Sequence, residues 1–297
     1  MKAHLLIAHG KVATTVGFSS NPQAGKHFGE VKIFEKGYVL VQDEVIICVT
    51  QSFAEALSLC TADTEVIDAT NQLVIPGFID CHTHLSFAGW RDNELSLRLA
   101  GASYLDILAA GGGILSTVDK TRQASLQELT GIVKRTLDVM LSHGTTTVEA
   151  KSGYGLNISD ELKQLRALKL ANGSHPVDIV ATFMGAHALP LEYANKREEY
   201  VRLIIEEMIP KVVDEGLAEF CDCFYEKKAF NEEETRAIML VAKAVGLGVK
   251  IHADEITPLG GASLAAELGA ISAEHLIHAD NDGLKRMAEV GVIAVLL

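Results

Sequence analysis

The sequence has few cysteines, no long apolar run and a shortage of positive charge. Its five cysteines are scattered without a C-x-x-C pair, which argues against a disulfide framework and predicts a reducing, cytoplasmic location. No segment approaches the ~18 consecutive apolar residues of a membrane span, and the N-terminal stretch is too broken for a signal peptide. Lys and Arg number 26 against 39 Asp and Glu, and the resulting net charge of −13 disfavours binding to nucleic acid or to an anionic membrane surface.

The 297 residues divide into two regions of different pattern. The first contains short β-type runs at 31–34, 38–41 and 45–49, separated by Gly, Asp or Asn, and predicts a small β unit. From residue 73 on, short apolar strands alternate with longer helical stretches, which is typical of a parallel β/α domain. We therefore predict two domains, 1–72 and 73–297.

Seven strands are expected in the second region, at 73–80, 145–150, 177–183, 219–224, 248–253, 272–277 and 291–297. The helices expected between them are 125–142, 160–171, 196–215, 231–245, 260–268 and 282–289. A (β/α)₈ barrel needs eight strands, and this chain stops inside or just after the seventh. The predicted fold class is therefore α/β, an incomplete (β/α)₈ barrel of about seven strands.

Reactive side chains stand at the ends of these strands, where such barrels place their chemistry. His82 and His84 are two residues apart, so on a strand both rings point to the same face. His252, on another strand, supplies a third ligand for a metal ion. An H-x-H pair alone is weak evidence and more often marks an ordinary polar strand end, and His275 alone is compatible with a core histidine.

Residues 74–84 read VIPGFIDCHTH and resemble the entry motif of the amidohydrolase superfamily, in which a small β-sandwich precedes the barrel. Six further blocks are similar to the imidazolonepropionase family within it, whose members hydrolyse 4-imidazolone-5-propanoate to N-formimino-L-glutamate in histidine degradation. These blocks are FAGWR at 87–91, SYLDIL at 103–108, GGGILSTV at 111–118, KSGYGL at 151–156, FMGAHA at 183–188 and KIHADE at 250–255.

The resemblance implies a role for individual residues of the barrel. His82, His84 and His252 match the family's ligands for one metal ion, zinc or iron. His275 matches the histidine that orients or deprotonates the attacking water, a task that suits a group whose pKa lies near working pH. Glu255 matches a glutamate that positions the substrate ring or carries its proton.

Substrate contacts are implied at three further positions. Arg91 matches the residue that holds the propionate tail, and Tyr154 and His187 match other contacts with this small anionic substrate. Without the family, Arg91 reads as a surface ion pair and Tyr154 equally well as a packed ring. We interpret Lys151 as structural or as lying behind the metal ligands.

The family's fourth metal ligand is an aspartate at the end of the eighth barrel strand, which this chain does not reach. We therefore expect a C-terminally truncated member with three protein ligands, whose open barrel edges favour association, for example as a homodimer. Two alternatives stay open, namely hydrolysis of another cyclic amide, or a remnant that binds metal or ligand without catalysis.

Overall fold

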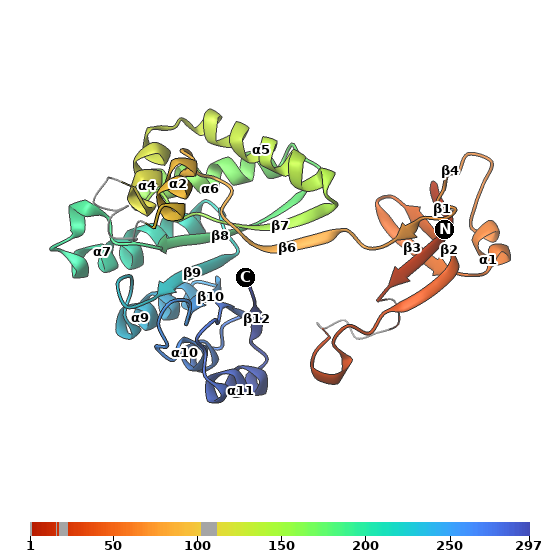
Figure 1. Ribbon diagram of the computed structural model, residues 1–297. Coiled ribbons are helices and arrows are strands. Elements are labelled where there is room, and N and C mark those ends of the chain that lie inside the picture. The colour runs from red at the N-terminus through yellow and green to blue at the C-terminus, as the bar shows by residue number, and fades with distance from the viewer. Residues whose placement is uncertain (1, 16, 18–22, 102–111) are drawn as a thin grey trace. The chain divides into compact units, whose positions relative to one another are not determined.

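The computed structural model describes residues 2–15, 17, 23–101 and 112–297 and divides the chain into two compact units, Met1–Gly77 and Phe78–Leu297 (Figure 1). Each unit has its own sheet. Among the described residues, no helix combines the length and the apolar character needed to cross a membrane. The assignment of 1–72 and 73–297 to two domains stays a prediction.

The first unit is a five-stranded mixed sheet with the strand order β3-β2-β1-β4, in which β5 also pairs with β1. Its elements are β1 (Leu5–Thr14), the 3₁₀ turn η1 (Gly25–His27), β2 (Lys32–Gln42), β3 (Val45–Thr50), α1 (Phe53–Ser58), β4 (Glu65–Asp68) and β5 (Leu73–Val74). The predicted runs 31–34 and 38–41 belong to the single strand β2. Gly37 continues this strand because it pairs with Gly10 of β1, where a Cβ on Gly37 would overlap the side chain of Val12.

The second unit is a seven-stranded parallel sheet in sequential order, from β6 to β12. Its strands are β6 (Phe78–Thr83), β7 (Thr145–Lys151), β8 (Asp178–Ala186), β9 (Phe220–Tyr225), β10 (Gly248–Ala253), β11 (Ser272–His275) and β12 (Ile293–Val295). Within the described residues β6 and β12 are its two edges. The predicted fold class is confirmed, since the unit is an incomplete (β/α)₈ barrel.

The first predicted barrel strand, 73–80, is wrong in its bounds. Leu73 and Val74 form β5 and pair with β1 of the first unit, whereas the barrel strand begins at Phe78. Pro76 lies between them, and it carries no N–H to donate to a strand ladder. The N–H of Phe78 donates to the carbonyl of Gly144 at 2.9 Å, which places β6 beside β7.

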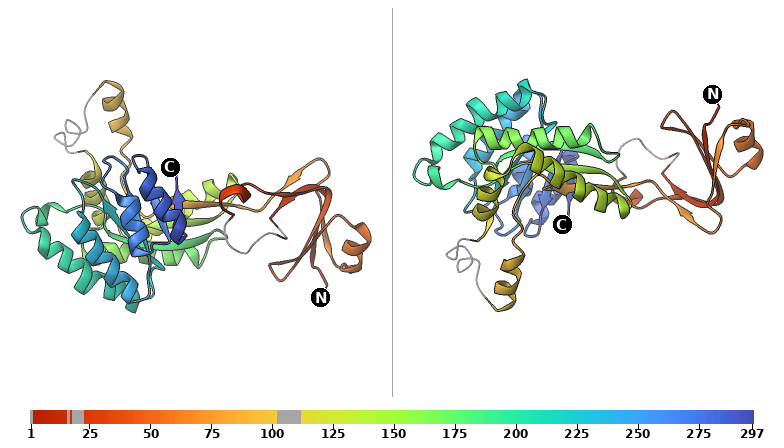
Figure 2. Two further views of the ribbon diagram at one scale, coloured as in Figure 1. Left: turned by 90° about the horizontal axis from the view of Figure 1, so that it is seen from below. Right: turned by 90° about the horizontal axis from the view of Figure 1, so that it is seen from above.

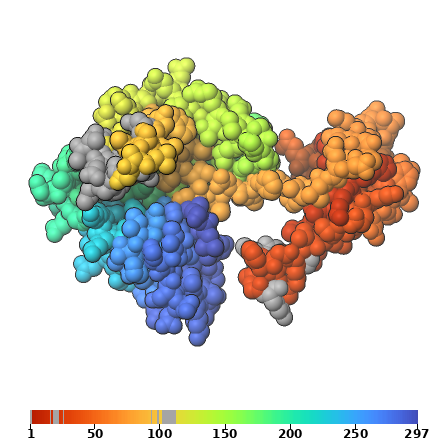
Figure 3. All heavy atoms as spheres, viewed as in Figure 1, coloured from red at the N-terminus to blue at the C-terminus, as the bar shows by residue number. Residues whose placement is uncertain are grey.

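The second unit also contains helices, which are α2 (Asp92–Leu99), α4 (Ile114–Gln123), α5 (Leu126–Ser142), α6 (Ile158–Asn172), α7 (Arg197–Leu203), α8 (Ile209–Asp214), α9 (Glu232–Ala244), α10 (Gly261–Leu268) and α11 (Asn281–Val290). Of these, α5, α6, α9 and α10 pack against the strands on the outer side of the curved sheet, whereas α2 extends away from it (Figures 1 and 2). In Figure 3, α10 and α11 form one continuous surface. The sequence pattern did not predict α2 and α4.

The helix expected over 196–215 is interrupted. Between α7 and α8 the backbone forms a π-helical turn, η3 (Ile204–Met208), and Pro210 stands in the first turn of α8. Because proline lacks an N–H, it cannot make the usual bond to the carbonyl four residues earlier, and a local change of helical geometry accommodates it.

The core of the second unit lies between the helices and the outer side of the sheet. Val133 and Leu137 of α5, together with Leu165 and Leu168 of α6, are fully buried in it. α5 begins with a capping box, in which the Ser125 side chain accepts from the N–H of Glu128 and the Glu128 side chain bonds back to Ser125.

We expect Leu168→Ala to lower the free energy of unfolding by about 2–5 kcal/mol, because it leaves a cavity in this core. Leu170→Ala on the same helix is the matched control, since Leu170 is 52% exposed. Urea unfolding followed by far-UV circular dichroism measures both. Equal losses for the two variants would contradict the assignment of α6's buried face.

Candidate metal centre

Five histidines from four strands or strand ends gather at one end of the parallel sheet. The ring centroids of His82 lie 4.7 Å from His252 and 5.1 Å from His275. The rings of His84 and His187 are stacked at 4.9 Å with an interplanar angle of 15°. All five were singled out from the sequence, and the structure brings them together.

Three of these histidines present a metal-ligand set. Ring nitrogens of His82, His84 and His252 all lie within 4.8 Å of one another. Nδ1 of His82 lies 2.9 Å from Oε2 of Glu274, and Nδ1 of His252 lies 3.0 Å from Oδ2 of Asp222. When an acceptor faces Nδ1, the other nitrogen, Nε2, is left to bind a metal.

The loop after β7 holds the two stacked rings, those of His84 and His187. Nδ1 of His84 lies 3.2 Å from the carbonyl oxygen of Ser152, and Nδ1 of His187 lies 3.0 Å from that of Gly153. Gly153 has φ +108°, and a Cβ there would come within 2.8 Å of Nδ1 of His187. Glu161 of α6 fixes this loop by accepting the N–H groups of Gly153, Gly155 and Leu156.

This donor set fits a metal ion on two grounds. Each of His82, His84 and His252 has an acceptor beside Nδ1, an arrangement typical of metal-binding imidazoles. Beside the site, Oδ1 of Asp222 is also buried without a hydrogen-bond partner among the described groups, which is unusual for a buried carboxylate oxygen.

His275 and Glu255 lie together beside the ligand set, with His275 Nε2 3.6 Å from Glu255 Oε2. His275 and Leu276 both have positive φ, 68° and 57°, which turns the chain sharply at the end of β11. Burial, aided by the charge of His252 and His82, lowers the pKa of His275 to about 4, and burial raises the pKa of Glu255. The imidazole is thus neutral near pH 7 and available as a base.

Tyr154 and Arg91 complete the predicted set. The Tyr154 ring lies 5.4 Å from His84 and 5.2 Å from His187. Burial raises the pKa of Tyr154 and the charge of Arg91 partly offsets this, so the guanidinium is within electrostatic reach of the ring. Arg91 Nη1 is 3.9 Å from Oε2 of Glu94, too long for a hydrogen bond.

Two parts of the sequence resemblance are not tested by this geometry. Residues 103–108 and Gly111 lie outside the described residues. Gly113 begins α4 with φ 77° and donates its N–H to Glu94 at 2.6 Å, so this glycine is part of a helix start rather than a free turn.

Sequence reasoning missed the cavity that adjoins the cluster. A cavity of about 370 Å³ reaches His187 and is lined by apolar groups such as Phe224 and Ile256, with Glu226 and Lys227 at its polar part. Its size is that of a small-molecule site. The sequence signal was weak, because Glu226, Lys227 and Ile256 lie in the loops after β9 and β10.

The ion pairs behind the ligands were also missed. Lys151 Nζ lies 2.6 Å from Glu149 and 2.8 Å from Asp222. Burial lowers the pKa of Lys151, but the carboxylates of Asp222 and Glu149 outweigh it and raise that pKa above its ordinary value. The lysine therefore stays charged and paired, in line with its interpretation as lying behind the metal ligands. The signal available was a set of charged residues inside otherwise apolar strands.

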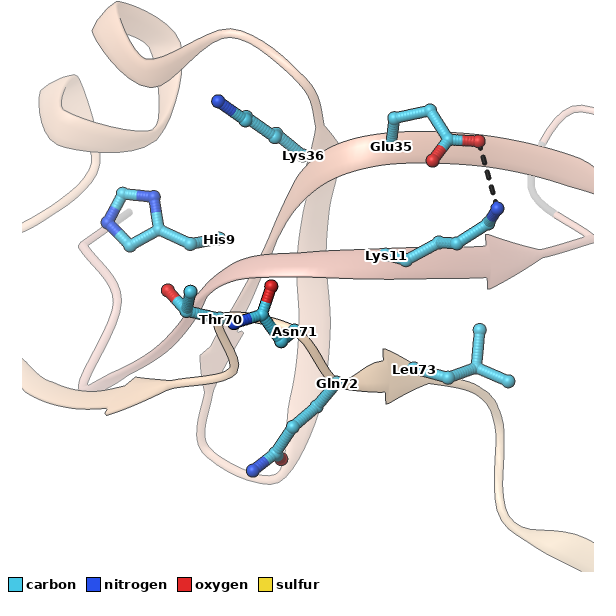
Figure 4. A pocket seen from close by; sticks show the side chains of 8 residues that line it. All are labelled: His9, Lys11, Glu35, Lys36, Thr70, Asn71, Gln72 and Leu73. Atoms are coloured by element: carbon cyan, nitrogen blue, oxygen red, sulfur yellow. Dashed lines mark ion pairs between the residues drawn. The ribbon is translucent and has the colours of Figure 1, made fainter.

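The first unit has a separate cavity of about 520 Å³, drawn in Figure 4. Lys11 of β1 and Glu35 of β2 face each other there in an ion pair of 3.0 Å. His9 is the histidine among its lining residues, and none of the predicted site residues belongs to it.

Comparisons with known proteins show the family of this chain. The amidohydrolase family model matches residues 73–295. The imidazolonepropionase of Alkaliphilus metalliredigens (strain QYMF) is 48% identical over 100% of the chain, and that of Geobacillus sp. (strain WCH70) is 50% identical over 97%. The chain belongs to the imidazolonepropionase branch of the amidohydrolase family. It spans 70% and 68% of the length of these two family members.

A comparison with a solved structure of low sequence identity supports the fold and nothing further. The 5-methylcytosine deaminase from Klebsiella pneumoniae liganded with 5-fluorocytosine has a TM-score of 0.64 and 16% identity, and the match covers 97% of this chain and 64% of that one. Amidohydrolases are metal-dependent, and the cluster of His82, His84 and His252 is suited to hold the metal of this family.

The metal-free chain should lose stability as pH falls from 6.5 to about 4. Burial lowers the pKa of His187 to about 3 and that of His275 to about 4, from an ordinary value of 6.5. In this window the unfolded chain binds protons that the folded chain does not, so acid favours unfolding. Urea midpoints across this range measure the slope.

His187→Gln should reduce this slope by up to about 1.4 kcal/mol per pH unit, the value for one proton. His278→Gln is the control, because His278 is exposed. A slope that His187→Gln leaves unchanged would contradict the depressed pKa.

Proposed function

We propose that the chain hydrolyses 4-imidazolone-5-propanoate to N-formimino-L-glutamate in histidine degradation. The observation that carries this proposal is the five-histidine cluster, with its ligand set of His82, His84 and His252, in a chain about half identical to named imidazolonepropionases. A cytoplasmic location and a homodimer stay predictions.

His82, His84 and His252 hold the metal ion in this proposal. When bound, a zinc or iron ion supplies Lewis acidity and lowers the pKa of a bound water. Imidazole nitrogens bind both zinc and iron well, so the ligand types do not distinguish the two ions. The metal content of the purified protein decides between them.

His275 and Glu255 move protons. Neutral His275 accepts a proton from the attacking water, since burial keeps its pKa low. Glu255 lies 3.6 Å from His275 Nε2, and its raised pKa suits it to carry that proton on to the ring nitrogen that leaves.

Arg91, Tyr154 and His187 hold and orient the substrate. The guanidinium of Arg91 pairs with the propionate carboxylate, and this local charge overcomes the repulsion between an anionic ligand and an acidic protein. The rings of Tyr154 and His187 are T-shaped at 5.2 Å, and His187 also lines the cavity beside the cluster.

His252→Ala should abolish both metal retention and turnover, because one of three imidazole ligands is lost. The test is formation of formiminoglutamate by the zinc- or iron-loaded chain, with metal content measured by mass spectrometry. His278→Gln is the matched control and should keep both. A His252→Ala variant that retains metal and turnover would contradict the site, and turnover of hydantoins or dihydropyrimidines instead would contradict the substrate.

Arg91→Ala should raise KM for the propionate substrate by roughly 10- to 100-fold, the cost of about 1.5–3 kcal/mol for a lost charged hydrogen bond. The same substitution should change KM little for an imidazolone without a carboxylate. Arg166→Ala is the control, since Arg166 pairs with Glu215 on the outer helices. An equal effect on both substrates would rule out Arg91 as the carboxylate contact.

A further inference from the structure

Five charged side chains inside the second unit form a row of ion pairs in which negative and positive charges alternate. We call this row the five-charge chain, and its order is Glu274, Lys250, Glu149, Lys151 and Asp222. Each is at most 6% exposed. Lys250 Nζ lies 3.4 Å from Oε1 of Glu274 and 3.1 Å from Oε1 of Glu149. Lys151 Nζ lies 2.6 Å from the same Oε1 of Glu149 and 2.8 Å from Oδ2 of Asp222. Glu149 therefore joins the two halves of the five-charge chain, because both lysines pair with its Oε1.

The strand register explains why these residues meet. Glu149 and Lys151 are two residues apart on β7, so their side chains share one face. Lys250 pairs with Asp222 across β10 and β9. Thr182 of the neighbouring strand β8 adds a hydroxyl that donates to Oε1 of Glu149 at 2.5 Å.

The two ends of the five-charge chain, Glu274 and Asp222, contact histidines of the metal centre. Oε2 of Glu274 lies 2.9 Å from Nδ1 of His82, and Oδ2 of Asp222 lies 3.0 Å from Nδ1 of His252. Each terminal carboxylate is thus shared between one lysine and one imidazole. A carboxylate at Nδ1 fixes the tautomer and orientation of the ring and makes Nε2 a better ligand.

We propose that this five-charge chain orients His82 and His252 as one unit, with Glu149 as the positioning residue that couples them. The Glu149 carboxylate neutralises part of the positive charge of both lysines. Without that charge the lysines draw Glu274 and Asp222 toward themselves and away from the imidazoles. Loss of Glu149 then weakens the metal centre, although this side chain has no contact with either histidine in the described structure. The inference rests on the proposed metal site.

The test is the Glu149→Gln variant of the 297-residue chain, titrated with Co²⁺ against a chelator and followed by its visible d–d absorbance. We expect metal binding 10- to 100-fold weaker than in the unchanged chain, with an altered d–d spectrum. In an Asp222→Asn background the same substitution should weaken binding less, because one end of the chain is already broken.

Glu234→Gln is the matched control. Glu234 is also a largely buried, ion-paired carboxylate, with its side chain 14% exposed, and it accepts hydrogen bonds from Arg197 and from the N–H of Asn231 at the start of α9. Its loss should lower stability but leave the affinity for Co²⁺ and its spectrum unchanged. If Glu149→Gln does not fold, Thr182→Val removes one hydrogen bond from Glu149 while it keeps all five charges, and should weaken Co²⁺ binding several-fold.

A folded Glu149→Gln variant that binds Co²⁺ with unchanged affinity and spectrum would overturn the coupling, and so would an equal effect of Glu234→Gln. Unchanged Co²⁺ binding by Thr182→Val would do the same where Glu149→Gln does not fold. Those outcomes leave the metal site itself intact. The proposed metal site is tested separately by His252→Ala, and unchanged Co²⁺ binding by that variant would contradict the site.

Discussion

Charge pairing on the inner face of the parallel sheet is the interaction on which the second unit depends. A lysine or carboxylate without a partner in that environment is strongly unfavourable, so the strands tolerate Lys151 and Asp222 only as a pair. Asp222 shows the balance directly. Burial raises its pKa, but His252 and Lys151 outweigh burial and hold that pKa well below its ordinary value. The outer helices supply the apolar burial that holds the strands in register.

Buried carboxylates fix the loops above the sheet in the same way. Asp254 accepts the N–H groups of four consecutive residues, Leu259 to Ala262, and so fixes the start of α10. Glu226 accepts two N–H groups of the loop after β10. Asp254 and His275 both have positive φ, 50° and 68°. Such backbone strain persists only where the surroundings hold it, and these bonds place Glu255 and His275 beside the ligands.

The sequence alone was sufficient to predict where the strands lie and which histidines stand at their ends, because both depend on local patterns. Short apolar runs between helical stretches located all seven strands, and strand-end positions located His82 and His252. It was insufficient where a partner far along the chain decides the outcome. Leu73 and Val74 belong to the first sheet because they pair with β1. The charge chain needs contacts between residues 71 and 101 positions apart, which no periodicity contains.

The three histidines of the proposed metal site, His82, His84 and His252, are not held alike. Carboxylates hold His82 and His252, so these rings depend on the sheet interior. A backbone carbonyl, that of Ser152, faces His84, and the next carbonyl along faces His187. The loop that carries these two carbonyls continues into Tyr154, whose N–H donates to Gln164 of α6. A displacement of this loop would therefore move His84, His187 and Tyr154 together, whereas a change in the five-charge chain would reach only His82 and His252.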